Sequence, residues 1–277
     1  MARRRGATPR RRPPPRPRAG ARSRRTRRAW RLPSPVQLAL YLVCAAMFAV
    51  GADLIYQVIR KPTELLFPVS GVLYKTPGET WRAYAGVFRG NATAHVSAEL
   101  LAALAQVEGS GNPLVRTYWR WSWPARPLDF YRPASSAVGM YQITDPTFAE
   151  ARHYCIHDHQ LVREGAWDAW HACWFNRLYL RVVPADAVEL TAAYLELKVA
   201  AILEPPLKAT PLQVQHLGAV VHLCGAGAAA AYARRGFRFS AGQRCGDHDP
   251  RDYLERVDAL SREFARLAAR EAQPAPQ

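Results

Sequence analysis

One carboxylate in the sequence occupies a position where a charge is costly. Residues 98–108, AELLAALAQVE, place Leu100, Leu101 and Leu104 on one predicted helical face, and Glu108 follows on that same face. Two glycines and a proline then end the helix. A carboxyl group held against apolar side chains is harder to ionise, so it stays protonated near neutral pH and can act as a general acid. Glu108 is therefore a candidate catalytic acid; the alternative is a surface glutamate at a frayed helix end.

A second stretch, SSAVGMYQITDPTF at residues 135–148, holds groups suited to binding a sugar. Gly139 allows a close approach of the backbone to a neighbour. The side-chain amide of Gln142 both donates and accepts hydrogen bonds, which suits hydroxyl and acetamido groups. Each residue also has a simpler interpretation, with Gly139 in a turn and Gln142 as a cap or a solvent-facing side chain.

An aromatic segment lies between these two stretches. Residues 117–136, TYWRWSWPARPLDFYRPASS, interleave aromatic side chains with arginines. Aromatic faces pack well against sugar rings, so Trp119 and Trp121 are candidate substrate contacts. Asp129 could supply a second carboxylate for hydrolysis, although its spacing gives no strong support. The alternative is that the aromatic side chains anchor a long loop on the domain.

Four of the five cysteines lie in the C-terminal part of the chain, and Cys44 lies in an apolar run near the N-terminus. An even number in an oxidising compartment predicts disulfides. Three pairings are possible, and we favour Cys155–Cys173 with Cys224–Cys245 because each closes a short loop. The competing interpretation is a zinc site, but the spacing C-x-H-x-H…H-x-C matches no standard zinc finger. We expect no metal and no cofactor.

The N-terminal part separates into a basic tail and that apolar run. The first 31 residues contain fourteen Arg and no acidic residue, so the rest of the chain carries only +2 of the formal +16. Residues 1–34 are rich in Pro and Arg and are predicted to be disordered. Residues 35–59 contain a single charge, Asp53, and are long enough to cross a bilayer as one transmembrane helix.

The arginine block predicts the orientation of this span. Positive charge on one flank retains that flank in the cytoplasm and attracts anionic lipid. Nucleic-acid binding through phosphate contacts is an alternative that we do not favour. A cleaved signal peptide ending near residue 51 is a second alternative, but the leading region is too long and the apolar run continues past Asp53. We expect the C-terminal part outside the cytoplasmic membrane.

Beyond residue 97 the pattern is helical, without convincing strand alternation. We expect helices at 98–108, 144–153, 167–181, 186–203, 211–222, 226–234 and 250–271. The sequence therefore predicts a mainly α domain at residues 96–270. A stem at 60–95 precedes it, and a disordered tail at 271–277 follows it.

The order of several motifs resembles the catalytic domain of soluble lytic transglycosylases, in the goose-type lysozyme superfamily. E-x-x-x-N-P starts at Glu108, and further blocks follow at 137–148 (A-x-G-x-x-Q-I-x-x-P-T-F), 192–195 (AAYL), 220–227 (VVHLCGAG) and 253–257 (YLERV). The resemblance covers about residues 95–260 and implies a lysozyme-like fold with Glu108 as the catalytic residue. It also implies substrate contacts at Ser110, Asn112, Gly139, Met140, Tyr141, Gln142, His222 and Tyr253.

This resemblance implies cleavage of peptidoglycan glycan strands. Glu108 would protonate the bond between N-acetylmuramic acid and N-acetylglucosamine, then accept the proton of the muramic acid 6-hydroxyl as that oxygen attacks its own anomeric carbon. The product is a 1,6-anhydro end. One carboxylate serves both steps, so the second carboxylate of most glycosidases is not required.

Three departures from the family pattern matter. Gly109 stands where the family has Ser, His222-Leu223 replaces a Tyr-Asn pair, and the segment between Glu108 and Gly139 is longer. His222 either supplies a ring and a hydrogen bond in place of Tyr, or is a core histidine. Two alternatives therefore stay open: a muramidase that hydrolyses the same bond, and a non-catalytic peptidoglycan-binding module.

Together these features predict a single-pass protein of the bacterial inner membrane, with its N-terminus in the cytoplasm and a lysozyme-like domain in the periplasm. The expected partners are peptidoglycan strands and anionic lipid of the inner membrane. A conjugation or secretion complex that spans the envelope is a further expected partner, by family analogy only.

Overall fold

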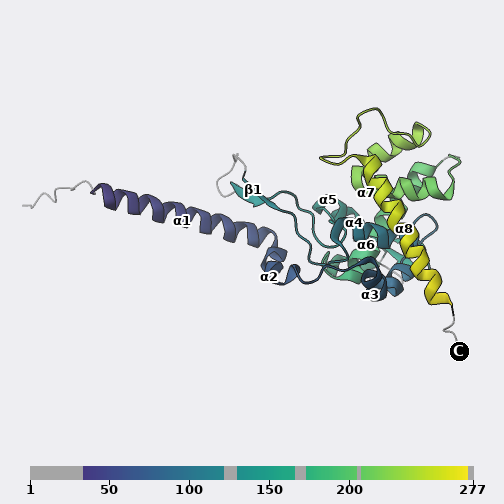
Figure 1. The fold of residues 1–277 in the computed structure, drawn as a ribbon, viewed down its shortest axis with the longest axis horizontal. Coiled ribbons are helices and arrows are strands. Elements are labelled where there is room, and N and C mark those ends of the chain that lie inside the picture. The colour runs from purple at the N-terminus through teal and green to yellow at the C-terminus, as the bar shows by residue number, and fades with distance from the viewer. Residues whose placement is uncertain (1–33, 122–129, 166–172, 205–206, 274–277) are drawn as a thin grey trace, which may run out of the picture. The chain divides into compact units, whose positions relative to one another are not determined.

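The computed structural model describes residues 34–121, 130–165, 173–204 and 207–273, and these are mainly helical (Figure 1). The chain divides into two units, residues 1–46 and 47–277. Of the predicted disordered segments, residues 1–33 and 274–277 lie outside the described residues, whereas Glu271 and Ala272 belong to the last helix and not to a disordered tail. The elements in chain order are α1 (Pro35–Arg60), η1 (Pro62–Leu66), α2 (Phe67–Ser70), α3 (Pro77–Gly90), α4 (Ala98–Gly109), β1 (Trp119–Trp121), β2 (Tyr131–Pro133), α5 (Asp145–Ala151), β3 (Tyr154–His157), β4 (Gln160–Arg163), η2 (Cys173–Leu178), α6 (Pro184–Leu203), α7 (Pro211–Arg234) and α8 (Pro250–Ala272).

Helix α1 matches the predicted span closely. It has 26 residues, more than the roughly 20 that cross a bilayer core. Among the described residues, α1 and α7 are the two helices long and apolar enough to cross a membrane. They differ in their surroundings, because α7 packs against α6 and α8 and buries Leu217, Val220 and Val221, whereas most of α1 is exposed. We therefore take α1 as the candidate membrane span and α7 as a core helix.

The core forms around α4. Leu100, Leu101 and Leu104 are all 1 % exposed or less, which confirms the predicted buried face. Helices α3, α6, α7 and α8 pack on α4, and the contact between α4 and α8 is the most extensive of these. Residues 98–105 are buried nearly all round because neighbours cover α4 on several sides.

The predicted stem at 60–95 needs correction, because its second half belongs to the core. Helix α3 begins with a capping box in which Thr76 and Glu79 bond each other's backbone N–H groups. Its buried face carries Trp81 and Phe88, and the Trp81 ring centroid lies 5.7 Å from that of Phe264 on α8. Helix α3 is therefore part of the same hydrophobic core as the helices beyond residue 96.

Other elements differ in detail from the expectation. The two helices predicted at 211–222 and 226–234 form one element, α7, kinked at Gly225, where φ is +79°. The helix predicted at 167–181 is wrong in its described part, which holds the 3-10 helix η2. Two antiparallel hairpins, β1–β2 and β3–β4, were not expected. Their strands have three or four residues, too few for alternation to show in the sequence.

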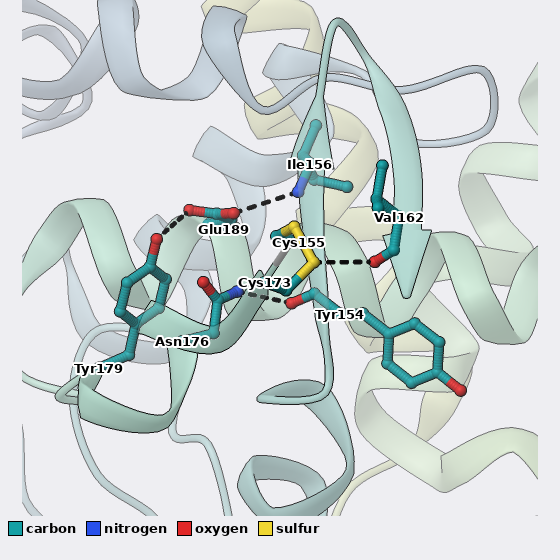
Figure 2. The surroundings of a disulfide bond; sticks show 8 residues. All are labelled: Tyr154, Cys155, Ile156, Val162, Cys173, Asn176, Tyr179 and Glu189. Carbon is teal, nitrogen blue, oxygen red and sulfur yellow. Dashed lines mark hydrogen bonds between the residues drawn. A yellow bond between two sulfur atoms is a disulfide. The ribbon is translucent and has the colours of Figure 1, made fainter. Parts of the chain in front are cut away.

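Both preferred disulfides are present, Cys155–Cys173 and Cys224–Cys245. The first joins β3 to η2, as Figure 2 shows. Asn176 donates a 2.6 Å hydrogen bond from Nδ2 to the Tyr154 carbonyl on the same junction. Glu189 of α6 accepts bonds from the Tyr179 hydroxyl (2.7 Å) and the Ile156 amide (3.1 Å). These contacts fasten the β3–β4 hairpin to α6, and the disulfide occupies the sulfur atoms that a zinc site would need.

Candidate active site

Glu108 lies in the last turn of α4, where the helix leaves the core. The helix begins at Ser97, whose side chain caps the Leu100 amide, and it ends at Ser110 in the left-handed conformation (φ +47°). The side chain of Glu108 is 19 % exposed, compared with complete burial of Leu101 and Leu104 on the same face. The carboxylate therefore stands at the edge of the apolar core and is still within reach of solvent or a ligand.

Tyr253 is the closest polar partner of that carboxylate. Its hydroxyl donates a 2.6 Å hydrogen bond to Oε1 of Glu108 from the first turn of α8. The residue is 2 % exposed, and burial, followed by the negative charge of Glu108, raises the pKa of Tyr253 well above its usual 10. The phenol therefore stays protonated and remains a donor at every physiological pH, which occupies Oε1 and leaves Oε2 for other partners.

His222 of α7 approaches the same oxygen from a third helix. Its Nε2 lies 3.7 Å from Oε1 of Glu108, beyond hydrogen-bond distance, and its side chain is 12 % exposed. Burial lowers the pKa of His222, opposed by the charge of Glu108 and a hydrogen bond with the Tyr141 backbone. The ring of His222 also meets the Tyr141 ring edge-on, with centroids 6.4 Å apart. Three helices thus converge on one carboxylate.

The backbone of Met140 packs directly against the residue after Glu108. A Cβ atom built on Gly109 would lie 2.8 Å from the Met140 Cα atom and 2.9 Å from its carbonyl oxygen. Gly111, with φ at +63°, is equally confined, because a Cβ there would lie 2.2 Å from Oγ1 of Thr80. A glycine at position 109 therefore has a physical reason in this chain, because the 139–142 loop occupies the space of a side chain.

Three of the predicted substrate contacts are fully buried: Asn112, Met140 and Tyr141 are each 0 % exposed. Asn112 donates from Nδ2 to the Ser70 carbonyl (2.6 Å), and its Oδ1 accepts from the Leu114 amide (2.9 Å). The Tyr141 hydroxyl donates to the Leu101 carbonyl (3.0 Å). The side-chain polar atoms of Asn112 and Tyr141 therefore bond the protein itself.

Gln142 and Gly139 form a tight turn around Met140 and Tyr141. Gln142 has φ at +49°, and its amide nitrogen donates to the carbonyls of Gly139 (2.9 Å) and Val115 (3.2 Å). Its Oε1 makes no hydrogen bond within the part of the chain that the structure describes. Gly139 has φ at +79° and lies so close to the Arg181 carbonyl that a Cβ would approach it to 2.1 Å. The close approach at Gly139 is thus to the protein backbone.

The predicted aromatic contacts, Trp119 and Trp121, belong to the β1–β2 hairpin. Trp119 donates from Nε1 to Oε2 of Glu64 in η1 (2.9 Å), and Lys61, just after α1, donates to the Ala137 carbonyl (3.0 Å). Trp121 is 69 % exposed and packs on Tyr131, with ring centroids 4.7 Å apart. Asp129, the second carboxylate considered for hydrolysis, lies outside the described residues.

No model of a known protein family matches the chain, and no curated protein matches its sequence. What the site can do must therefore be inferred from its own geometry. That geometry places Glu108, Tyr253 and His222 together and sets Ser110 at the left-handed end of α4. No sequence pattern predicts the bond between Tyr253 and Glu108, or the bond between Trp119 and Glu64 that anchors the hairpin. Both bonds join residues far apart in the chain, so no local spacing indicates the partner.

Proposed function

We propose that the protein is a membrane-anchored lytic transglycosylase that cleaves peptidoglycan glycan strands and leaves 1,6-anhydro ends. One observation carries the proposal: the carboxylate at the predicted catalytic position is held by a buried tyrosine hydroxyl at 2.6 Å, at the edge of the core. A fixed, partly exposed carboxylate with one oxygen available is suited to general acid and base catalysis. The motif order that resembles the lytic transglycosylases supplies the substrate.

The proposed reaction needs one proton carrier. Protonated Glu108 delivers its proton to the bridging oxygen while the bond from that oxygen to C1 of the muramic acid breaks. The 6-hydroxyl oxygen then forms its bond to C1, and its proton passes to the Glu108 carboxylate. The acid is regenerated without water. Throughout the cycle Tyr253 keeps its hydrogen bond to Oε1, so the second oxygen stays aimed at the reacting groups.

The proposed reaction requires no carboxylate besides Glu108. A glycosidase that uses a second carboxylate would place it roughly 5–10 Å from the first. Asp129, the other acidic candidate from the sequence, lies outside the described residues.

The predicted setting agrees with this chemistry. Helix α1 has the length and apolar character of a membrane span, and the two disulfides fit an oxidising compartment. We propose that the arginine-rich N-terminus is cytoplasmic and that the domain faces the periplasm, where peptidoglycan lies. A tethered enzyme of this kind would open the wall locally, as a conjugation or secretion complex requires.

The test uses Glu108→Gln with Glu99→Gln as its matched control, because Glu99 lies in the first turn of the same helix. Purified sacculi are digested with each full-length protein in detergent, and the released muropeptides are identified by mass spectrometry. We expect 1,6-anhydro products from the wild type and the control, and a rate ~10²- to 10⁴-fold lower for Glu108→Gln because the amide cannot carry the proton.

Three outcomes would count against the proposal. Equal rates for both variants would show that Glu108 is not the catalyst. Products with only reducing ends would identify a muramidase. Binding of sacculi without any cleavage by the wild type would identify a peptidoglycan-binding module.

A further inference from the structure

The segment that follows α1, residues 62–74, places apolar side chains outside and a charged one inside. Leu65, Val69 and Val72 are 67 %, 50 % and 81 % exposed. The side chain of Glu64, in the same segment, is only 2 % exposed. Single exposed aliphatic residues are ordinary on a protein surface, but three of them within eight residues, above a buried carboxylate, form a patch that calls for a cover. The outer face of this segment is therefore suited to an apolar medium.

Two other segments bring exposed apolar side chains to the same place. The β1–β2 hairpin is joined to η1 because Glu64 accepts the hydrogen bond of Trp119, and Trp121 of this hairpin is 69 % exposed. The chain between η2 and α6 carries Leu178 and Leu180, which are 71 % and 57 % exposed. These two leucines border a pocket of about 780 Å³ together with the last turn of α1. All three segments therefore adjoin the C-terminal end of α1.

Exposed apolar side chains are rare in the rest of the domain. Beyond Val183, the part of the chain that the structure describes holds a single exposed large apolar residue, Leu212. A cluster of such residues on one part of a surface marks a site of contact with a partner or a membrane. We call the clustered side chains the apolar collar, and its members are Leu65, Val69, Val72, Trp121, Leu178 and Leu180.

The position of the collar indicates lipid as its occupant. Helix α1 has 26 residues, and roughly 20 are enough to cross the hydrocarbon core, so its last turn would emerge among the lipid headgroups. Leu65 follows the end of α1 by five residues, which is at most roughly 18 Å of extended chain. Trp is enriched at this depth of a membrane, and Trp121 belongs to the collar. Lipid is therefore already present beside the collar, whereas a protein partner would have to displace it.

We infer that the apolar collar rests in the lipid interface of the membrane at the point where α1 leaves it. The collar is then a second membrane contact besides the span itself, and it holds the domain against the bilayer surface. Glu64 fastens the hairpin to η1 behind the collar, so that both segments meet the lipid as one surface. This inference rests on the proposed membrane anchoring by α1, and it is independent of glycan cleavage.

The test measures contact between single side chains and lipid. Cys44 in α1 is the free cysteine, so the wild type takes a thiol-reactive, polarity-sensitive fluorophore there. Leu65→Cys and Val72→Cys, each combined with Cys44→Ser, place the fluorophore on the collar. Leu212→Cys with Cys44→Ser is the matched control, because Leu212 is also an exposed aliphatic residue (55 %) but lies in the first turn of α7. Each full-length protein is placed in phosphatidylcholine nanodiscs, with and without a phosphatidylcholine that carries a nitroxide quencher on its acyl chain.

We expect quenching at positions 65 and 72 within about twofold of that at Cys44 and at least about fivefold above that at position 212, because interfacial apolar side chains lie ~5–10 Å into the boundary between headgroups and acyl chains. Quenching at Cys44 with only the control level at 65 and 72 would overturn the inference and leave the span intact. No quenching at Cys44 would refute the span and the inference together. Emission at 65 and 72 that shifts to the blue without quenching would overturn the inference too, because a protein surface, such as a second copy of this chain, would then cover the collar.

Discussion

A methyl group added at Gly109 would test the packing that holds Glu108 in place. A Cβ there would lie 2.8 Å from the Met140 Cα atom, about 0.7 Å inside the usual carbon–carbon contact of roughly 3.5 Å. The atoms nearest to the added Cβ belong to the backbone of Met140, so they cannot rotate aside, and α4 must separate from the 139–142 loop. Overpacking of this kind costs about 1–3 kcal/mol. Gly109→Ser would fare no better, because its Cβ lies in the same place.

Gly86→Ala is the matched control for this change. Gly86 is an exposed residue in the middle of α3, and a Cβ there meets nothing within 4 Å. Alanine should therefore stabilise α3 by about 0.5–1 kcal/mol through helix propensity alone. The two variants should differ by about 1.5–4 kcal/mol in the free energy of unfolding, or roughly 3–16 °C in Tm for a domain of this size.

Thermal unfolding of each full-length variant in detergent, followed by tryptophan fluorescence, measures that difference. If the protein has the proposed activity, Gly109→Ala should also lower the rate of muropeptide release, because separation from the loop displaces the residue next to Glu108. If Gly109→Ala unfolds at or above the temperature of Gly86→Ala, the close contact between Gly109 and Met140 does not exist in solution. The physical reason for a glycine at position 109 would then fail.

Three further predictions concern the same domain. Tyr253→Phe removes a hydrogen bond to a charged group, worth about 1.5–3 kcal/mol, so turnover should fall ~10- to 100-fold in muropeptide assays while binding to sacculi is retained; unchanged turnover would remove Tyr253 from the site. Burial holds the pKa of His222 below its ordinary 6.5, so the unfolded chain binds the extra proton first. The contribution of neutral His222 to folding stability is therefore fully present above pH 6.5 and is lost as the pH falls below 6.5. His222→Gln should reduce the fall of Tm between pH 7 and pH 5. An identical fall of Tm in the variant and the wild type would refute this. Replacing both Cys155 and Cys173 by serine should lower the free energy of unfolding by about 3 kcal/mol, because the disulfide closes a loop with a sequence separation of 18. Urea unfolding of the variant and of the oxidised wild type measures this loss, and a loss near zero would contradict the prediction.

The sequence predicts the helices that carry the core because their apolar residues recur at helical spacing. The buried face of α4, the span at α1 and the later helices α6 and α8 all begin within two residues of the expected positions. Local loop closure also selected both disulfide pairings. These features depend on residues close together in the chain, which is the range in which periodicity, capping and loop entropy act.

Features that depend on distant partners were not predictable in the same way. Helix α3 has a strong capping box, but its place in the core follows from Trp81 meeting Phe264, across the whole domain. The β1–β2 hairpin is held by Trp119 and Glu64, which no periodic pattern connects. Asn112 and Tyr141 stood in motifs that suggested substrate contact, yet their buried hydrogen bonds serve the protein itself. A motif identifies which residues are constrained, and only packing shows by what.

The end of α4 explains why a glutamate there needs a buried tyrosine. The C-terminus of a helix carries partial negative charge from its last carbonyl groups, so a carboxylate in the final turn is unfavourable. The last turn of α4 contains no lysine or arginine to compensate for it. Tyr253 supplies a neutral donor at 2.6 Å instead, brought in by α8. A cation in that place would hold the carboxylate as a permanent ion pair, whereas a phenol holds it and leaves it free to accept and release a proton, which is what a single catalytic acid and base must do.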